Sequence, residues 1–123
     1  MLIEPKRLTL ATLLPGARRT ATANGTGVDV RNYIGMAKVI LASGAGGGTN
    51  PTLDVKLQES DDNSTFADIT GAAFTQVTDA ADSTQELHVN LDSTKRYIRA
   101  VSTITGTSPT FDCAVVFVGQ NQS

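Results

Sequence analysis

The 123-residue sequence contains no tryptophan, and aromatic residues make up only 5% of it. Large rings therefore cannot supply most of a hydrophobic core. Glycine, threonine, alanine, serine and valine recur throughout, so the core must be assembled from small and β-branched aliphatic side chains. That composition favours strands over helices, and the length is typical of one domain.

Cysteine and long apolar stretches are equally scarce. The single cysteine, Cys113, cannot form an intrachain disulfide, and its place in the apolar run 111–118 predicts a buried small side chain. The apolar stretch Leu8–Leu14 is short and broken by threonines, so it predicts neither a membrane span nor a signal peptide. We expect no membrane partner, and a chain that is synthesised and folds in a reducing cytoplasm.

Only one histidine is present, which limits the metal and catalytic chemistry of the chain. His88 alternates with Glu86 and Asn90, so we expect all three on the exposed face of a strand. Transition-metal sites lack their usual ligands here, and no Gly-x-Ser-x-Gly sequence marks a nucleophilic serine. We expect no enzyme, no catalytic residues, no metal site and no cofactor. Paired carboxylates for glycoside cleavage need only spatial proximity and stay open, although no residue indicates them.

Two further stretches invite a functional interpretation, and in both a turn is the stronger one. The acidic stretch 59–64 could offer oxygens to calcium, but it lacks the spaced ligands of a calcium-binding hand. Asp, Asn and Ser also form tight turns, so we predict a turn there and keep calcium as the alternative. The glycine run 44–48 is followed by Pro51 and a predicted strand, which indicates a hairpin tip and not a phosphate-binding loop.

Charge is distributed unevenly along the chain. The formal net charge is −2, which argues against nucleic acid as a partner. Residues 1–19 nevertheless carry a net +3, whereas the remainder carries −5. With Pro5, Pro15 and Gly16, this contrast predicts an N-terminal arm over residues 1–27 and a folded domain over residues 28–123. We expect the arm to dock on a neighbouring protein through its charged and apolar residues, which are Lys6, Arg7, Leu8, Leu10, Leu13, Leu14, Arg18 and Arg19.

Short apolar runs separated by turn-forming residues fill the rest of the chain, as is typical of a β-sandwich. Alternation is clear where Leu53, Val55 and Leu57 interleave with polar residues. We predict an all-β fold: an antiparallel, jelly-roll-like β-sandwich of about eight strands with an extended N-terminal arm. The predicted strands are 27–30, 37–43, 52–59, 65–69, 73–77, 84–91, 95–105 and 110–118.

An internal repeat supports this interpretation. The segment Gly48–Asp54, GTNPTLD, recurs 58 residues later as Gly106–Asp112, GTSPTFD. Each copy follows one predicted strand and precedes another, and proline suits such a loop because it has no N–H to lose at a strand entrance. We therefore predict two related hairpins at one end of the sandwich.

The stretch 53–69, LDVKLQESDDNSTFADI, followed by KRYIRA at 95–100, resembles a group of small structural proteins encoded among the head genes of tailed bacteriophages. The resemblance covers residues 28–118. It implies a β-sandwich decoration or cement protein of the virion, which binds the major capsid protein on the capsid surface and stabilises the capsid by bridging neighbouring capsomers. The family brings no catalytic residues. The arm residues named above thereby become candidate capsid contacts.

Such proteins are often trimers or dimers, and we expect a homo-oligomer, a trimer in preference to a dimer. Weak contacts repeated over a lattice would sum to strong attachment. A carbohydrate-binding or fibre-associated β-sandwich module is the alternative, although such modules usually present exposed aromatic residues and this chain has few. A small cupin-type enzyme is the second alternative. It would need several metal-binding histidines, whereas this chain has one, which argues strongly against it.

Overall fold

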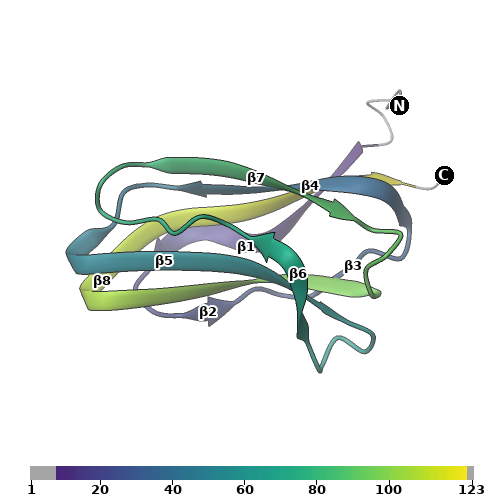
Figure 1. Cartoon of the computed structure of the whole chain (residues 1–123), viewed down its shortest axis with the longest axis horizontal. Coiled ribbons are helices and arrows are strands. Elements are labelled where there is room, and N and C mark those ends of the chain that lie inside the picture. The colour runs from purple at the N-terminus through teal and green to yellow at the C-terminus, as the bar shows by residue number, and fades with distance from the viewer. Residues whose placement is uncertain (1–7, 122–123) are drawn as a thin grey trace.

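A computed structural model describes residues 8–121, and within that range the chain forms eight strands and no helix (Figure 1). Nothing in that range is therefore a helix long and apolar enough to cross a membrane. All strand pairings are antiparallel, so the predicted all-β fold is confirmed. The strands are β1 (Leu8–Arg19), β2 (Ala23–Asn24), β3 (Val28–Asp29), β4 (Tyr33–Ser43), β5 (Gly47–Ser60), β6 (Ala67–Ala73), β7 (Ser83–Asn90) and β8 (Tyr97–Asn121).

The strands form two layers that are joined through β8 (Figure 1). The first part of β8, residues 97–110, pairs with β5, β2 and β3, and β5 pairs with β6; we call this layer sheet B. The second part, residues 111–121, pairs with β1 and β4, and β4 pairs with β7; we call this layer sheet A. The predicted β-sandwich is thus confirmed, with one strand running through both layers.

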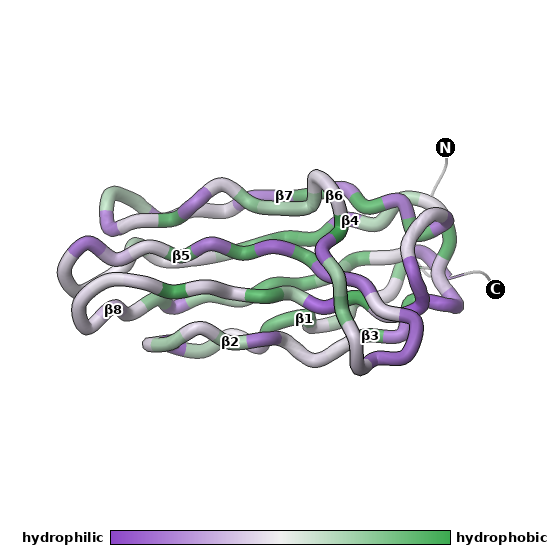
Figure 2. Tube along the Cα trace, turned by 60° about the horizontal axis from the view of Figure 1, so that its bottom comes forward, coloured by the Kyte–Doolittle hydropathy of each residue, from purple (hydrophilic) through white to green (hydrophobic). Residues whose placement is uncertain are grey.

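The core lies between the sheets and uses the alternating apolar positions that the sequence predicts. Leu53, Val55 and Leu57 of β5 are buried, and Figure 2 shows hydrophobic and hydrophilic positions alternating along this strand. From the other layer, Phe117 of β8 packs edge-on against Tyr33, with ring centroids 5.1 Å apart. Leucine, valine and alanine form most of the remaining core, in keeping with the composition.

The two copies of the internal repeat lie at one end of the sandwich and pair with each other. Thr49 lies opposite Thr107, and the equivalent residues Asn50 and Ser108 share a left-handed backbone, with φ of 50° and 49°. Each repeat carries the chain from one sheet to the other, since the first joins β4 to β5 and the second joins the two parts of β8. They are therefore arches between sheets and not the hairpins we predicted.

The structure corrects the predicted N-terminal arm, because residues 8–19 form strand β1 and pair with β8. Leu13 and Leu14 are 0% and 1% exposed in the same core as the other strands. β1 has two register shifts, and the second, between Leu14 and Ala17, accommodates Pro15 and Gly16, the residues that had indicated a linker. This segment therefore belongs to the sandwich and does not lie outside it.

The acidic stretch forms the predicted turn, between β5 and β6. Asp62 Oδ1 accepts bonds from the backbone N–H groups of Thr65 and Ser64, both at 2.9 Å, and from the Ser60 hydroxyl at 2.8 Å. These bonds, with that from Thr65 the largest contribution, lower the pKa of Asp62. The carboxylate thus binds its own loop, and within residues 8–121 no group of three His, Cys, Asp or Glu residues is placed to hold a metal ion.

Cys113 is buried, as predicted, with 4% of the residue exposed. Burial also raises the pKa of its thiol, so the reactive thiolate is disfavoured twice. We expect a thiol reagent to label the native protein more slowly than the denatured protein by a factor on the order of 10³, because labelling requires unfolding. Labelling that is quenched at successive times and followed by mass spectrometry measures both rates. Equal rates for the native and the denatured protein would contradict the buried position of Cys113.

Candidate interaction surface

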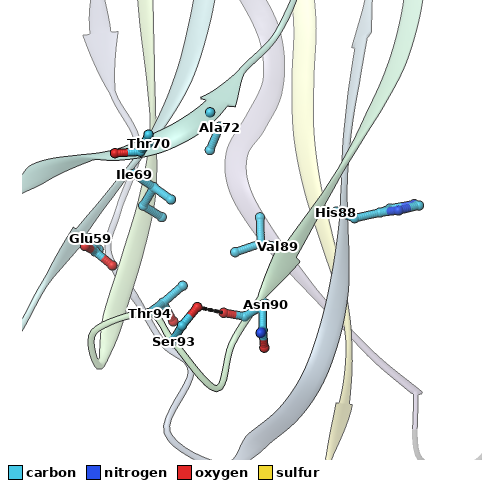
Figure 3. Close-up of a pocket in the computed structure, with 10 residues that line it drawn as sticks. Glu59, Ile69, Thr70, Ala72, His88, Val89, Asn90, Ser93 and Thr94 are labelled. Atoms are coloured by element: carbon cyan, nitrogen blue, oxygen red, sulfur yellow. Dashed lines mark hydrogen bonds between the residues drawn. The ribbon is translucent and has the colours of Figure 1, made fainter.

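A pocket of about 410 Å³ lies at the open edge of the sandwich, between β6 and β7 (Figure 3). Its lining includes the Glu59 carboxylate, which accepts the backbone N–H of Lys95 at 3.1 Å. The His88 ring points away from the pocket (Figure 3) and is exposed, as predicted, with Nε2 3.7 Å from Glu86 Oε1. The Ser93 hydroxyl in the lining donates to the Asn90 carbonyl at 3.1 Å, so the pocket does not pair it with the His88 imidazole (Figure 3).

Polar side chains cover the outer face of sheet B and bond to one another. Lys56 Nζ and Gln58 Nε2 donate to the carboxylate of Asp68, at 3.1 and 2.9 Å, and the two donors lower the pKa of Asp68, Gln58 the more strongly. Gln58 Oε1 accepts two bonds from Arg99, whose guanidinium lies 4.0 Å from the centroid of the Phe66 ring. Such a face is stable in contact with water.

The outer face of sheet A instead carries several apolar side chains on its central strands, which are interrupted by Lys38, paired with Glu86 at 3.1 Å. Outward-facing residues of adjacent strands form rows across the sheet, and one row runs from Thr12 through Val116 to Ile40. We call the large outward-facing apolar residues of this sheet the apolar face: Leu8, Leu10, Met36, Ile40, Val116 and Val118.

This apolar face includes every large hydrophobic side chain that is strongly exposed between residues 8 and 121. Leu10 is 69% exposed, Met36 53% and Leu8 42%. A hollow of about 360 Å³ lies between Leu8, Met36 and Val118, and Lys38 and His88 also line it. Contiguous exposed apolar surface of this kind marks a site where another molecule binds, so this is the candidate functional site.

The apolar residues predicted as capsid contacts fall in two places. Leu8 and Leu10 lie on the apolar face and are free to contact a partner. Leu13 and Leu14 lie in the core and are not accessible while β1 remains in the sheet.

Of the four basic candidates, Lys6 and Arg7 lie outside the described residues. The other two, Arg18 and Arg19, bond to groups of this chain. Arg18 Nε donates to Asp112 Oδ1 at 3.0 Å, and this exposed pair raises the pKa of Arg18 and lowers that of Asp112. Arg19 Nη2 donates to the Pro15 carbonyl at 2.6 Å, and its Nε is buried without a hydrogen-bond partner.

Sequence reasoning missed the residues of β4 and β8 that complete the apolar face. Ile40 lies in the run Val39–Leu41, and Val116 and Val118 lie in the run Val115–Val118. Neither run alternates with polar residues. Uninterrupted apolar strands indicate that both faces of a sheet are covered, and this signal could have identified the surface.

The aromatic residues do not supply a sugar-stacking platform. All six lie in the described range, and none is exposed: Phe74, Phe111 and Phe117 are buried, and Tyr33, Phe66 and Tyr97 are partly buried. The alternative of a carbohydrate-binding module gains no support from this distribution.

Neither a protein family nor a curated protein matches the sequence. Solved structures do share the fold. The PBSX exported protein XepA is 19% identical with a TM-score of 0.61, over 94% of this chain and 38% of its own. The SPBc2 prophage-derived protein YomS is 10% identical with a TM-score of 0.53, over 91% of both chains.

A chain of infectious bursal disease virus, Gx strain, is 10% identical with a TM-score of 0.67, over 100% of this chain and 36% of its own. This chain thus spans little more than a third of the length of XepA and of the viral chain. At such identities the likeness concerns the fold. The chain therefore has a β-sandwich fold that also occurs in phage-derived and viral proteins, as its resemblance to phage head proteins implied.

Proposed function

We propose that the protein is a non-enzymatic structural protein of a bacteriophage virion, which decorates the capsid surface and cements it by bridging subunits of the major capsid protein. The apolar face of sheet A carries this proposal. Covering exposed apolar surface gains about 25 cal/mol per Å², whereas the hydrogen-bonded polar face of sheet B gains little from a partner. The protein attaches with sheet A towards the shell and sheet B towards water.

Two further observations support a structural role. The fold recurs in proteins of two prophages and of a virus, and the His88 ring points away from the pocket between β6 and β7, where the Ser93 hydroxyl is bonded to the backbone. Attachment as a homo-oligomer, a trimer or a dimer, would multiply weak contacts with a repeating lattice.

Shell binding tests the proposal through charges placed on the apolar face. We expect Ile40→Lys and Val116→Lys each to weaken binding by at least about tenfold, because an unpaired charge at an apolar interface costs more than about 1.4 kcal/mol. The measurement is occupancy on purified mature shells that lack the protein, determined by co-sedimentation over a range of protein concentrations. Because apolar contacts dominate, occupancy of the unmodified protein should change little with salt.

Thr103→Lys is the matched control, since Thr103 is exposed on the outer face of sheet B at a central strand. This variant should bind as well as the unmodified protein. Full occupancy by Ile40→Lys and Val116→Lys would contradict attachment through sheet A, and no binding of the unmodified protein would contradict the decorating role itself.

A further inference from the structure

Sheet A ends in two edge strands, β1 and β7. Among residues 8–121, β1 pairs only with β8 and β7 only with β4, so each has one edge without a partner strand. An unpaired edge presents a row of N–H and C=O groups on which another strand can add. Natural sheets usually protect such edges with prolines, lysines, bulges or very short strands.

The edges of sheet B have this protection. On one side, β2 and β3 are only two residues long each. On the other side, the ladder between β5 and β6 is irregular opposite Leu57, where residues 69–72 have no partner in β5. Gly71 in that segment has φ of 79° and interrupts the extended backbone. Neither edge offers a regular strand.

The edges of sheet A are protected over only half of their length. The second half of β1 contains Pro15 and the bulges, and Gln85 at the start of β7 exchanges two bonds, of 2.8 and 2.9 Å, with the backbone of Thr75. The other halves, Leu8–Thr12 (LTLAT) and Glu86–Asn90 (ELHVN), are regular and contain no proline, glycine or lysine.

These two unprotected stretches lie at the same level of the sheet. Val118 and Lys38 stand between Leu10 and His88 in a single row. Because all pairings in the order β1, β8, β4, β7 are antiparallel, β1 and β7 run in opposite directions. A second copy placed beside the first in the same orientation therefore brings its β1 alongside β7 as the next antiparallel strand.

We infer that copies of this protein associate edge to edge, with Leu8–Thr12 of one copy pairing with Glu86–Asn90 of the next. Leu10 then lies opposite His88, and the outer faces of sheet A in successive copies form one sheet surface, on which the polar outward residues of β7 (Glu86, His88 and Asn90) alternate with the apolar faces. The contact uses different edges on the two partners, so it repeats until a ring closes, as in a trimer. This inference rests on the self-association in the proposed function but not on shell binding.

Disulfide trapping between Leu10→Cys and His88→Cys tests the contact in solution. Within one chain the two positions are three strand spacings apart, roughly 14 Å, whereas a disulfide needs Cα atoms within about 7 Å. Any disulfide between them must therefore join two chains. We expect a mixture of the two single variants to give cross-linked dimers on mild oxidation, visible on a non-reducing gel. A protein that carries both Leu10→Cys and His88→Cys should give a ladder of multimers. The ladder should end in a closed ring, in which every introduced thiol is oxidised.

Each single variant alone should give only the level of the unmodified protein, whose Cys113 is buried. A mixture of His88→Cys with Thr103→Cys is the matched control and should also stay at that level. Dimers from Leu10→Cys alone would overturn the inference in favour of a symmetric contact, and a mixture without cross-links at high protein concentration would overturn edge pairing. Loss of shell binding with the cross-links intact would count only against the proposed function.

Discussion

Removing residues 1–24 is expected to abolish cooperative folding of the remaining chain. The truncation deletes β1 and β2, and with β1 it removes Leu13 and Leu14, each of which contributes about 1.5–3 kcal/mol by burial. It also leaves residues 111–120 of β8 without a partner on one side. A domain of this size is stable by only about 5–15 kcal/mol, so these losses together remove most of its stability. Circular dichroism during thermal unfolding measures the result.

The double variant Leu8→Ser with Leu10→Ser is the control, because both side chains lie on the same strand but are exposed. It should unfold within about 1 kcal/mol of the unmodified protein. A truncated protein that keeps the midpoint and the cooperativity of the full chain would show that residues 8–19 are a dispensable arm after all.

Phe117→Ala is expected to be the most damaging single substitution, lowering the free energy of unfolding by about 3–5 kcal/mol. Phe117 is fully buried, packs edge-on against Tyr33 and extends over Gly119, where an added Cβ would lie 2.6 Å from the ring. The neighbouring strands hold these positions, so the core cannot collapse into the space that the ring leaves.

Denaturant titration measures this loss as a lower midpoint at an unchanged slope. Val118→Ala on the outer face of the same strand is the control and should cost less than about 1 kcal/mol in the isolated protein. Equal effects of the two substitutions would show that the ring is not part of a fixed core.

The body of the fold could be predicted from the sequence because its strands alternate. Where Leu53, Val55 and Leu57 interleave with polar residues, the pattern specifies both the strand and its buried face. β1 could not be found in this way, since its bulges shift the alternation and place Leu13 and Leu14 side by side in the core. Pro15 and Gly16 there indicate a linker from sequence alone, although an edge strand with bulges accepts both.

The candidate surface was only partly predictable for a different reason. Leu8 and Leu10 were identified, but as parts of an arm, because local sequence does not report which strands lie beside them. The contribution of Ile40 and Val116 depends on pairing between strands far apart in the chain. The repeat likewise predicted two related loops but not that they cross between sheets, because both kinds of loop use the same turn-forming residues.

The place of β8 in the fold affects how the protein is made. Five of the other seven strands pair with β8, and only the β4–β7 and β5–β6 pairings are independent of it. On the ribosome, β1 to β5 must therefore wait for residues 97–121 to emerge before they find this partner. Long-range pairing of this kind makes folding slow, on a timescale of about milliseconds to seconds. Until then the nascent chain exposes unpaired strands, which is the state most prone to aggregation during synthesis.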